Sequence, residues 1–323
     1  MAEVLNRKNL RGLIPPMVTP IQMDGGLDVS AIGRLVEHMV GGGVSGLFIL
    51  GTCGEGAALS YRKRYQFVEF VCEAARGRVP VLVSVSDTSY EEAVDLAEHA
   101  YASGASAVVS TGPFFLSVPM GHLETYFERL AEESRLPVVL YNMPGCTKFC
   151  LDPTMVARLA QHPKIIGIKD SSGDLKYIEQ LIQAVSPHDF PVLIGPEEIL
   201  IQAMRLGAVG GVNGGGVLFP GVYAARIAAF AAGDMELAAK ADRFVQRFSK
   251  QIFPTSSGRM AVIEAMKQGL AAMGLCQPWV LSPLQPLDSE HRQRIERKIA
   301  ELEIEAAEIC SVLNAERASG SRL

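Results

Sequence analysis

The sequence predicts an α/β fold, a (β/α)8 TIM barrel with a C-terminal helical extension, on three observations. Short apolar runs rich in Val, Ile and Leu recur over the first 230 residues, as expected of parallel strands buried on both faces. Segments with helical spacing of apolar residues separate these runs, and strand-like runs stop after about residue 230. An open doubly wound sheet also alternates strands with helices, so closure of the barrel is an expectation.

Eight apolar runs are the candidate strands, and each is short enough for a buried strand. In chain order they are LIPPMVT (13–19), VSGLFIL (44–50), VPVLVSV (79–85), ASAVVST (105–111), PVVLYN (137–142), KIIGIKD (164–170), FPVLIG (190–195) and AVGGVN (208–213).

The segments between the runs carry helix signals. Asp28 is expected to cap a helix whose apolar face holds Ile32, Leu35, Val36, Met39 and Val40. Asp152 followed by Pro153 gives a cap with proline at the first helical position. A third apolar stripe consists of Leu175, Ile178, Leu181, Ile182 and Val185. Strand and helix signals therefore alternate along the chain.

We expect two regions, a catalytic barrel over residues 1–230 and a helical region over 231–323. In the last helical segment, 288–316, one face carries Ile295, Ile299, Leu302, Ala306, Ile309 and Leu313. Such a stripe indicates packing against the barrel or a neighbouring subunit.

Composition argues against several function classes. The chain of 323 residues is 48% hydrophobic and has a net charge of -5, which leaves no basic surplus for binding nucleic acid. The uncharged stretch 206–225 contains seven glycines, which favours a strand, a loop and a helix start over a membrane span.

Cysteine and histidine spacing predicts neither disulfides nor a metal. The six cysteines include no CxxC pair, and the six histidines form no HExxH motif. Charged residues occur within the first residues of the chain, which also lack the apolar run of a secretory signal. We therefore expect a cytoplasmic protein that uses no cofactor and contacts no membrane.

Lys169 is the most informative polar residue at a strand end, where barrel enzymes place their active sites. It follows the apolar segment 165–168, where loss of water disfavours an ammonium ion. A neutral amine there can attack a carbonyl and form a Schiff base. The alternative is a lysine whose stem packs in the strand and whose ammonium group reaches solvent.

Other strand ends supply helpers and rival hypotheses. Tyr141 can pass protons with the help of a hydroxyl group such as that of Thr52, and the GTCGEG turn can hold a carboxylate on its N–H groups. Glycines 214–216 follow the eighth run, where many barrels bind phosphate, so a phosphosugar enzyme is a rival hypothesis. Glu197 and Glu198 either bind substrate hydroxyl groups or favourably charge the first turn of a helix.

Six motifs in order between Gly12 and Pro220 resemble the dihydrodipicolinate synthase and N-acetylneuraminate lyase family of pyruvate-type class I aldolases. They are LIPPMVTP, GTCGEG, TGPFF, YNMPG, GIKDSSGD and GAVGGVNGG. The resemblance implies a barrel enzyme, usually tetrameric, in which Lys169 forms the Schiff base with a 2-oxo acid. It also implies a proton relay through Tyr141 and Thr52.

Further assignments rest on the same resemblance. Cys53 stands where the family has a second hydroxyl residue, so one hydroxyl donor is lost. The backbone N–H of Cys53 can still hold the substrate carboxylate. Val212 matches the residue whose main-chain carbonyl faces the Schiff base. Glu197 matches the place where sugar-acid aldolases bind a polyhydroxylated tail, and Glu198 lies beside it.

Two departures argue against the synthase reaction. Cys146 replaces the arginine that binds the second carboxylate in synthases, with Lys148 two residues later, and Phe115 replaces a tyrosine contributed by an adjacent subunit. The sequence thus predicts a homo-oligomeric lyase or aldolase for a 2-oxo acid, favouring a sugar-derived one. Dihydrodipicolinate synthase, a keto-sugar-acid dehydratase and a non-catalytic binding relative stay open as alternatives.

Overall fold

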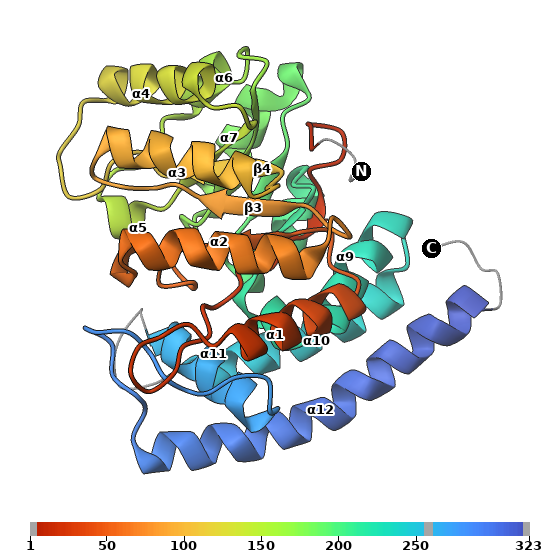
Figure 1. Ribbon diagram of the computed structural model, residues 1–323. Coiled ribbons are helices and arrows are strands. Elements are labelled where there is room, and N and C mark those ends of the chain that lie inside the picture. The colour runs from red at the N-terminus through yellow and green to blue at the C-terminus, as the bar shows by residue number, and fades with distance from the viewer. Residues whose placement is uncertain (1–4, 255–260, 319–323) are drawn as a thin grey trace.

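The computed structural model describes residues 5–254 and 261–318 (Figure 1). Within these residues eight parallel strands form one sheet, and helices lie between successive strands. The strands are β1 (Gly12–Leu13), β2 (Leu47–Ile49), β3 (Val81–Ser84), β4 (Ala107–Ser110), β5 (Val138–Asn142), β6 (Ile165–Asp170), β7 (Val192–Ile194) and β8 (Gly210–Gly211). Each overlaps one of the eight predicted runs.

The sheet closes into a barrel between β1 and β2. Hydrogen bonding runs in the order β1-β8-β7-β6-β5-β4-β3-β2. Beyond β1, Pro16 forms a parallel bridge with Phe48 of β2, and the Met17 N–H donates to the Phe48 carbonyl at 2.8 Å. The predicted (β/α)8 barrel is confirmed, and the open doubly wound sheet is excluded.

The first strand is shorter than predicted. The run 13–19 was expected to be extended throughout, whereas β1 ends at Leu13. Pro15 and Pro16 follow, and proline has no N–H to donate to a neighbouring strand. Regular pairing therefore gives way to the single bridge at Pro16.

Alternate residues of the strands fill the barrel interior. Leu82 of β3, Val109 of β4 and Val139 of β5 belong to one inner cluster of buried side chains. Their sequence neighbours, including Val83 and Val108, belong to a second cluster shared with the surrounding helices. This period of two decides which strand residues can face the mouth of the barrel.

Helices cover the outside of the barrel. They are α1 (Val29–Gly41), α2 (Tyr61–Ala75), α3 (Tyr90–Ala102), α4 (Met120–Glu133), α5 (Pro144–Thr147), α6 (Pro153–Leu159), α7 (Leu175–Val185), α8 (Leu200–Leu206) and α9 (Pro220–Ala232). Both predicted caps are confirmed: Asp28 accepts from the Ala31 N–H at 3.0 Å, and Asp152 accepts from the Thr154 N–H at 2.8 Å.

In the described residues after the barrel, the helices are α10 (Met235–Ile252), α11 (Ala261–Ala272) and α12 (Ser289–Ala318). Figure 1 shows α12 running along the outside of the molecule beside α10. Ile295, Ile299 and Ile309 of the predicted stripe are buried in the core shared with the barrel helices, and the side chain of Leu313 lies outside the described ones. Among the described helices, none combines the length and the apolar character that a membrane crossing requires.

Candidate active site

Lys169 points into the barrel from β6 and does not reach solvent. Only 6% of the residue is exposed. Its Nζ lies 4.0 Å from the ring centroid of Tyr141 and 4.6 Å from that of Phe48. The parallel pairing of β5 with β6 sets Tyr141 directly beside Lys169. The amine therefore lies against two aromatic rings at the carboxyl end of the barrel.

Tyr141 and Thr52 stand together next to this amine. The Tyr141 hydroxyl group lies 3.4 Å from Thr52 Oγ1, and the tyrosine is 3% exposed. The Tyr141 ring meets that of Phe48 edge to face, which fixes its orientation. The predicted triad of amine, phenol and hydroxyl groups is thus brought together from β6, β5 and the turn after β2.

The GTCGEG turn after β2 has a backbone that requires its glycines. A Cβ added to Gly56 would lie 1.9 Å from the Leu50 carbonyl oxygen. Leu50 and Glu55 both adopt left-handed conformations, with φ of 58° and 54°. In the described part of the chain, the N–H groups of Thr52 and Cys53 donate to no other residue. Binding of the substrate carboxylate by these two donors stays a prediction.

The Cys53 thiol is not built as a nucleophile. Burial raises its pKa to about 11, although the nearby Lys169 acts in the opposite direction. A thiol protonated at neutral pH reacts poorly, because the thiolate is the attacking form. The contribution of Cys53 at this position is therefore limited to its backbone and to the shape of the site.

Glu55 ties the turn to the C-terminal helices. Its carboxylate forms an ion pair with Lys267 of α11 and accepts from the Leu281 N–H at 2.6 Å. Lys267 also donates to the Trp279 carbonyl at 2.8 Å, and burial lowers the pKa of this lysine. Sequence reasoning missed this pair, because Lys267 lies more than 200 positions away with no local motif.

Asn142 and Asp170, the last residues of β5 and β6, point to the other face of the sheet. Asn142 Nδ2 donates to Asp170 Oδ1 at 2.7 Å, and Asn142 Oδ1 accepts from the Leu151 N–H at 3.0 Å. Burial raises the pKa of Asp170. Each is one residue from an inward-facing side chain, so the alternation of the strand turns it outward, where it fixes the loop after β5.

Glu197 and Val212 lie on the β7–β8 side of the barrel. Val212 is buried in the inner cluster. Glu197 is 3% exposed, its Oε2 accepts from the Gly215 N–H at 2.9 Å, and its other oxygen accepts from the Tyr223 hydroxyl group. Burial raises the pKa of Glu197 to about 7. Both carboxylate oxygens of Glu197 already have hydrogen-bond partners within the protein. Direct contact between Glu197 and the substrate stays a prediction.

The same contacts disfavour a phosphate site at glycines 214–216. The Gly215 N–H already donates to the Glu197 side chain, so it is not free to bind a phosphate group. A Cβ at Gly215 would lie 2.0 Å from the Tyr223 hydroxyl oxygen, so close packing accounts for this glycine. Glu198 accepts from the Ser249 hydroxyl group, outside the barrel.

A cavity of about 470 Å³, a size typical of small-molecule sites, is lined by Thr52 and Tyr141. Lys169 is not among its lining residues and lies behind the Tyr141 ring, with Nζ 4.0 Å from the ring centroid. The walls of the cavity come from the carboxyl ends of β2 to β5 and from residues 281–284. Among the described residues that line it, the one ionisable acid is Glu55, and Lys or Arg side chains are absent. Cys146 lines the cavity, whereas Lys148 is exposed outside it.

Comparisons with known proteins agree with this site. The sequence profile described as the dihydrodipicolinate synthetase family matches residues 9–302. The chain belongs to this family.

Relatives in the family differ in their reactions. The chain is 38% identical to a dihydrodipicolinate synthase structure from Bacteroides thetaiotaomicron, with a TM-score of 0.87 over 90% of this chain and 98% of that one. It is 33% identical to the probable 2-dehydro-3-deoxy-D-pentonate aldolase YjhH of Escherichia coli, over 85% of this chain and 92% of the relative. YagE of E. coli, crystallised with pyruvate, is 30% identical with a TM-score of 0.85, over 91% and 99% of the two chains.

Membership of the dihydrodipicolinate synthetase family makes the chain an enzyme of the class I aldolase type, a lyase or synthase. In the described residues no group of three or more His, Cys, Asp or Glu side chains is arranged to hold a metal ion. The structure places Phe115, one of the departures noted in the sequence, on an exposed loop with 87% of its surface free.

Proposed function

We propose that this enzyme is a Schiff-base lyase that cleaves or forms a carbon–carbon bond of a sugar-derived 2-oxo acid through the enamine of pyruvate. The observation that carries the proposal is the enclosed Lys169 amine beside the Tyr141–Thr52 pair. The available N–H groups of the GTCGEG turn and the pyruvate bound by the relative YagE support it.

Imine formation uses the three side chains in turn. With the substrate carboxylate on the N–H groups of Thr52 and Cys53, the Lys169 amine attacks the C2 ketone. The resulting carbinolamine loses its hydroxyl group as water, with Tyr141 supplying the proton and Thr52 holding the phenol in place. The product is a protonated imine, which draws electrons from the neighbouring carbon atoms.

Cleavage then follows from this electron sink. Tyr141 takes the proton of the C4 hydroxyl group, the C3–C4 bond breaks, and its electron pair enters the imine to give an enamine. The tail leaves as an aldehyde. Protonation at C3 and hydrolysis of the imine release pyruvate and restore the lysine, and condensation is the same sequence reversed.

The cavity favours a neutral tail over a second carboxylate. Among the described lining residues the one carboxylate, that of Glu55, is neutralised by Lys267, and Cys146 occupies the position expected for a carboxylate-binding arginine. An anionic second substrate would lose water without gaining a cation, at a cost of several kcal/mol. This supports an aldolase of hydroxylated 2-oxo acids over a dihydrodipicolinate synthase. A dehydratase using the same enamine is the second candidate.

Borohydride reduction in the presence of pyruvate tests the proposal. Peptide mapping should locate the reduced adduct on Lys169 and find none in the Lys169→Ala protein. Lys164→Ala is the matched control, since Lys164 lies just before the same strand and binds the carbonyls of Glu132 and Ser134. Pyruvate binding without an adduct would instead identify a non-catalytic relative.

We also propose that the enzyme is a homo-oligomer. Phe115 and Leu116 are exposed side by side on the loop between β4 and α4, at 87% and 55%. Burial of two such side chains against another subunit would contribute roughly 3–5 kcal/mol.

A further inference from the structure

Neighbouring strands end in polar residues that face the barrel axis. Leu82 of β3 and Val109 of β4 point inward, so the residues two positions later, Ser84 and Thr111, point the same way. Both line the cavity, together with Ser86. The inward positions thus change from apolar to hydroxyl-bearing at the carboxyl end of these two strands.

The strand register places these hydroxyl groups level with the catalytic residues. Ser110 pairs with Leu140 and Tyr141 with Lys169, so Thr111 stands in the same layer as the phenol and the amine. Ser86 continues the layer on the β3 side, because the Thr111 N–H donates to Ser86 Oγ at 3.0 Å. The hydroxyl groups therefore form an arc along the wall that adjoins Tyr141.

The arc retains capacity for a ligand. Ser84 Oγ and Ser86 Oγ are 3.1 Å apart and share one hydrogen bond, and Thr111 Oγ1 donates to the Gly112 carbonyl at 2.8 Å. Each hydroxyl group has one proton and two lone pairs, so even with the Thr111 N–H bound to Ser86 Oγ, each of the three residues keeps at least one unused donor or acceptor site. The three side chains together can meet a hydroxyl group of a bound molecule.

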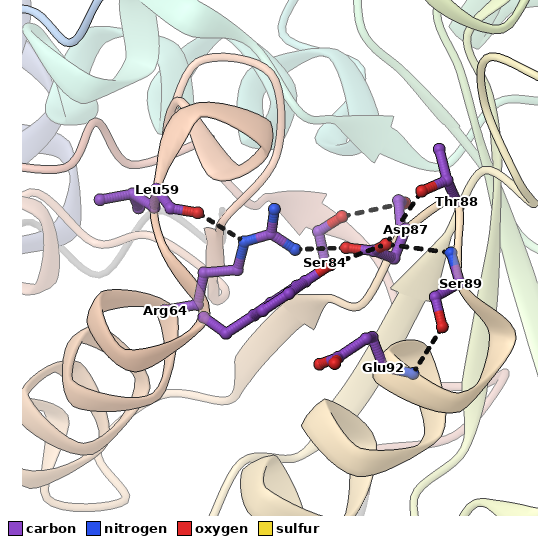
Figure 2. A network of polar contacts seen from close by, with 9 residues as sticks. Leu59, Arg64, Ser84, Asp87, Thr88, Ser89 and Glu92 are labelled. Atoms are coloured by element: carbon purple, nitrogen blue, oxygen red, sulfur yellow. Dashed lines mark hydrogen bonds and ion pairs between the residues drawn. The ribbon is translucent and has the colours of Figure 1, made fainter.

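A buried ion pair holds the arc in place. Arg64 Nη1 donates to Asp87 Oδ2 at 2.6 Å, and the Ser89 N–H donates to the other carboxylate oxygen at 3.0 Å, as Figure 2 shows. Burial opposes ionisation of Asp87, but the N–H of Ser89 and the Arg64 guanidinium outweigh it and hold the pKa below its ordinary value. The pair fixes the turn that follows Ser86.

On the opposite side of the barrel, the acid predicted to bind the substrate tail is already engaged. Glu197, the acid nearest to that side, already binds Gly215 and Tyr223 and is not among the residues that line the cavity. Open space and unfilled hydrogen-bonding capacity therefore coincide on the β3–β4 side.

We propose that Ser84, Ser86 and Thr111 form a subsite that recognises the hydroxyl group on the terminal carbon of a short polyhydroxylated tail. This inference rests on the proposed function, since it needs the substrate C2 to be bonded to Lys169. It assigns the substrate class to 3-deoxy-2-oxo sugar acids whose tail is uncharged, with the part beyond C4 lying against β3 and β4.

A pair of substrates that differ in one hydroxyl group tests the subsite. One is 2-dehydro-3-deoxy-D-pentonate, and the other is 4-hydroxy-2-oxopentanoate of the same C4 configuration, which lacks the C5 hydroxyl group. Both release pyruvate on cleavage, so kcat/KM is measured in the same assay. The native enzyme should prefer the pentonate by about tenfold or more, because a polar site left unpaired penalises the deoxy compound.

The ratio of kcat/KM for the pentonate to that for the deoxy compound should fall by about fivefold or more in three variants. These are Ser86→Ala, Thr111→Val and the double variant. The ratio of the two substrates is insensitive to losses of folded protein, which affect both equally. Ser110→Ala is the matched control: Ser110 lies on β4 but faces outward, bound to Tyr126 and to the Gly112 N–H. It should leave the ratio unchanged.

The two proposals fail in different ways. If the native enzyme forms the borohydride adduct on Lys169 but the variants keep the native preference for the pentonate, the subsite is overturned and the proposed function stands. If Lys169 is not labelled in the native enzyme, the proposed function fails and the inference fails with it.

Discussion

Glu55 and Lys267 form an ion pair from which solvent is excluded, with side-chain exposures of 1% and 0%. The pair joins the turn that offers N–H groups to the substrate carboxylate with α11. Through the Leu281 N–H, Glu55 also holds residues 281–284, which form one wall of the cavity. The C-terminal helices are thus connected to the shape of the active site.

Removing one partner of this pair should be costly. Glu55→Gln or Lys267→Met leaves a buried charge without its counterion, and we expect the free energy of unfolding to fall by about 3–5 kcal/mol. Urea unfolding measures this loss. The double variant should recover part of it, because both charges are then absent. Equal losses in the single and double variants would contradict a coupled pair.

The pair shows where sequence reasoning stops. Glu55 belongs to a recognisable glycine-rich turn, but Lys267 lies in an ordinary helical segment, AVIEAMKQGL. Nothing in the local pattern links the two, because their contact depends on how α11 packs on the barrel mouth. The strands and caps, by contrast, follow from local apolar runs and from Asp side chains, and the structure confirms them.

Tyr141→Phe should separate proton transfer from packing. The phenyl ring can still lie over the Lys169 amine, so the fold and the site shape should persist. Loss of the hydroxyl group should lower kcat for pyruvate release by about 10²–10⁴-fold, the usual contribution of a positioned acid or base, with a much smaller change in KM. Steady-state kinetics measures both parameters.

Tyr126→Phe is the control for this substitution. The Tyr126 hydroxyl group on α4 shares a hydrogen bond with Ser110, which faces away from the cavity, so kcat should remain near the native value. Thr52→Val should lower kcat less than Tyr141→Phe does. In the double variant the two losses should not add, because both act on one proton path. Full additivity would argue that Thr52 acts independently of the phenol.

The difference between Tyr141 and Asn142 marks a second limit of prediction. Both are polar residues at the end of the same strand. Strand alternation alone decides that one faces the axis while the other binds Asp170 outside. The β5–β6 register pairs Tyr141 with Lys169, so both side chains face the barrel axis.

Glu197 should make stability depend on pH. Its pKa is raised from 4.5 to about 7 by burial, so the native state keeps a proton that the unfolded chain releases near pH 4.5. The contribution to stability is present below that pH and is lost as pH rises toward 7, by roughly 3 kcal/mol in total. In the Glu197→Gln protein this contribution does not titrate.

The comparison of the two proteins isolates this effect. Glutamine can accept from the Gly215 N–H with its carbonyl and donate to Tyr223 with its amide, so the fold should persist. The unfolding free energy of the native protein minus that of the variant should fall between about pH 5 and pH 7.5. A difference that is flat across this range would show that Glu197 is ionised in the folded enzyme.

Phe115 should contribute to self-association. The residue is 87% exposed and has a left-handed φ of 78°, an unfavourable conformation for a bulky side chain that costs of order 1 kcal/mol or more. Contact with another subunit would compensate for both. Phe115→Ser should therefore raise the dissociation constant of the oligomer by at least about tenfold, as measured by sedimentation equilibrium.

Met23→Ser, at a residue that is 76% exposed on another loop, should leave this dissociation constant unchanged. If the native enzyme sediments as a monomer at micromolar concentration, the exposed phenylalanine has another role.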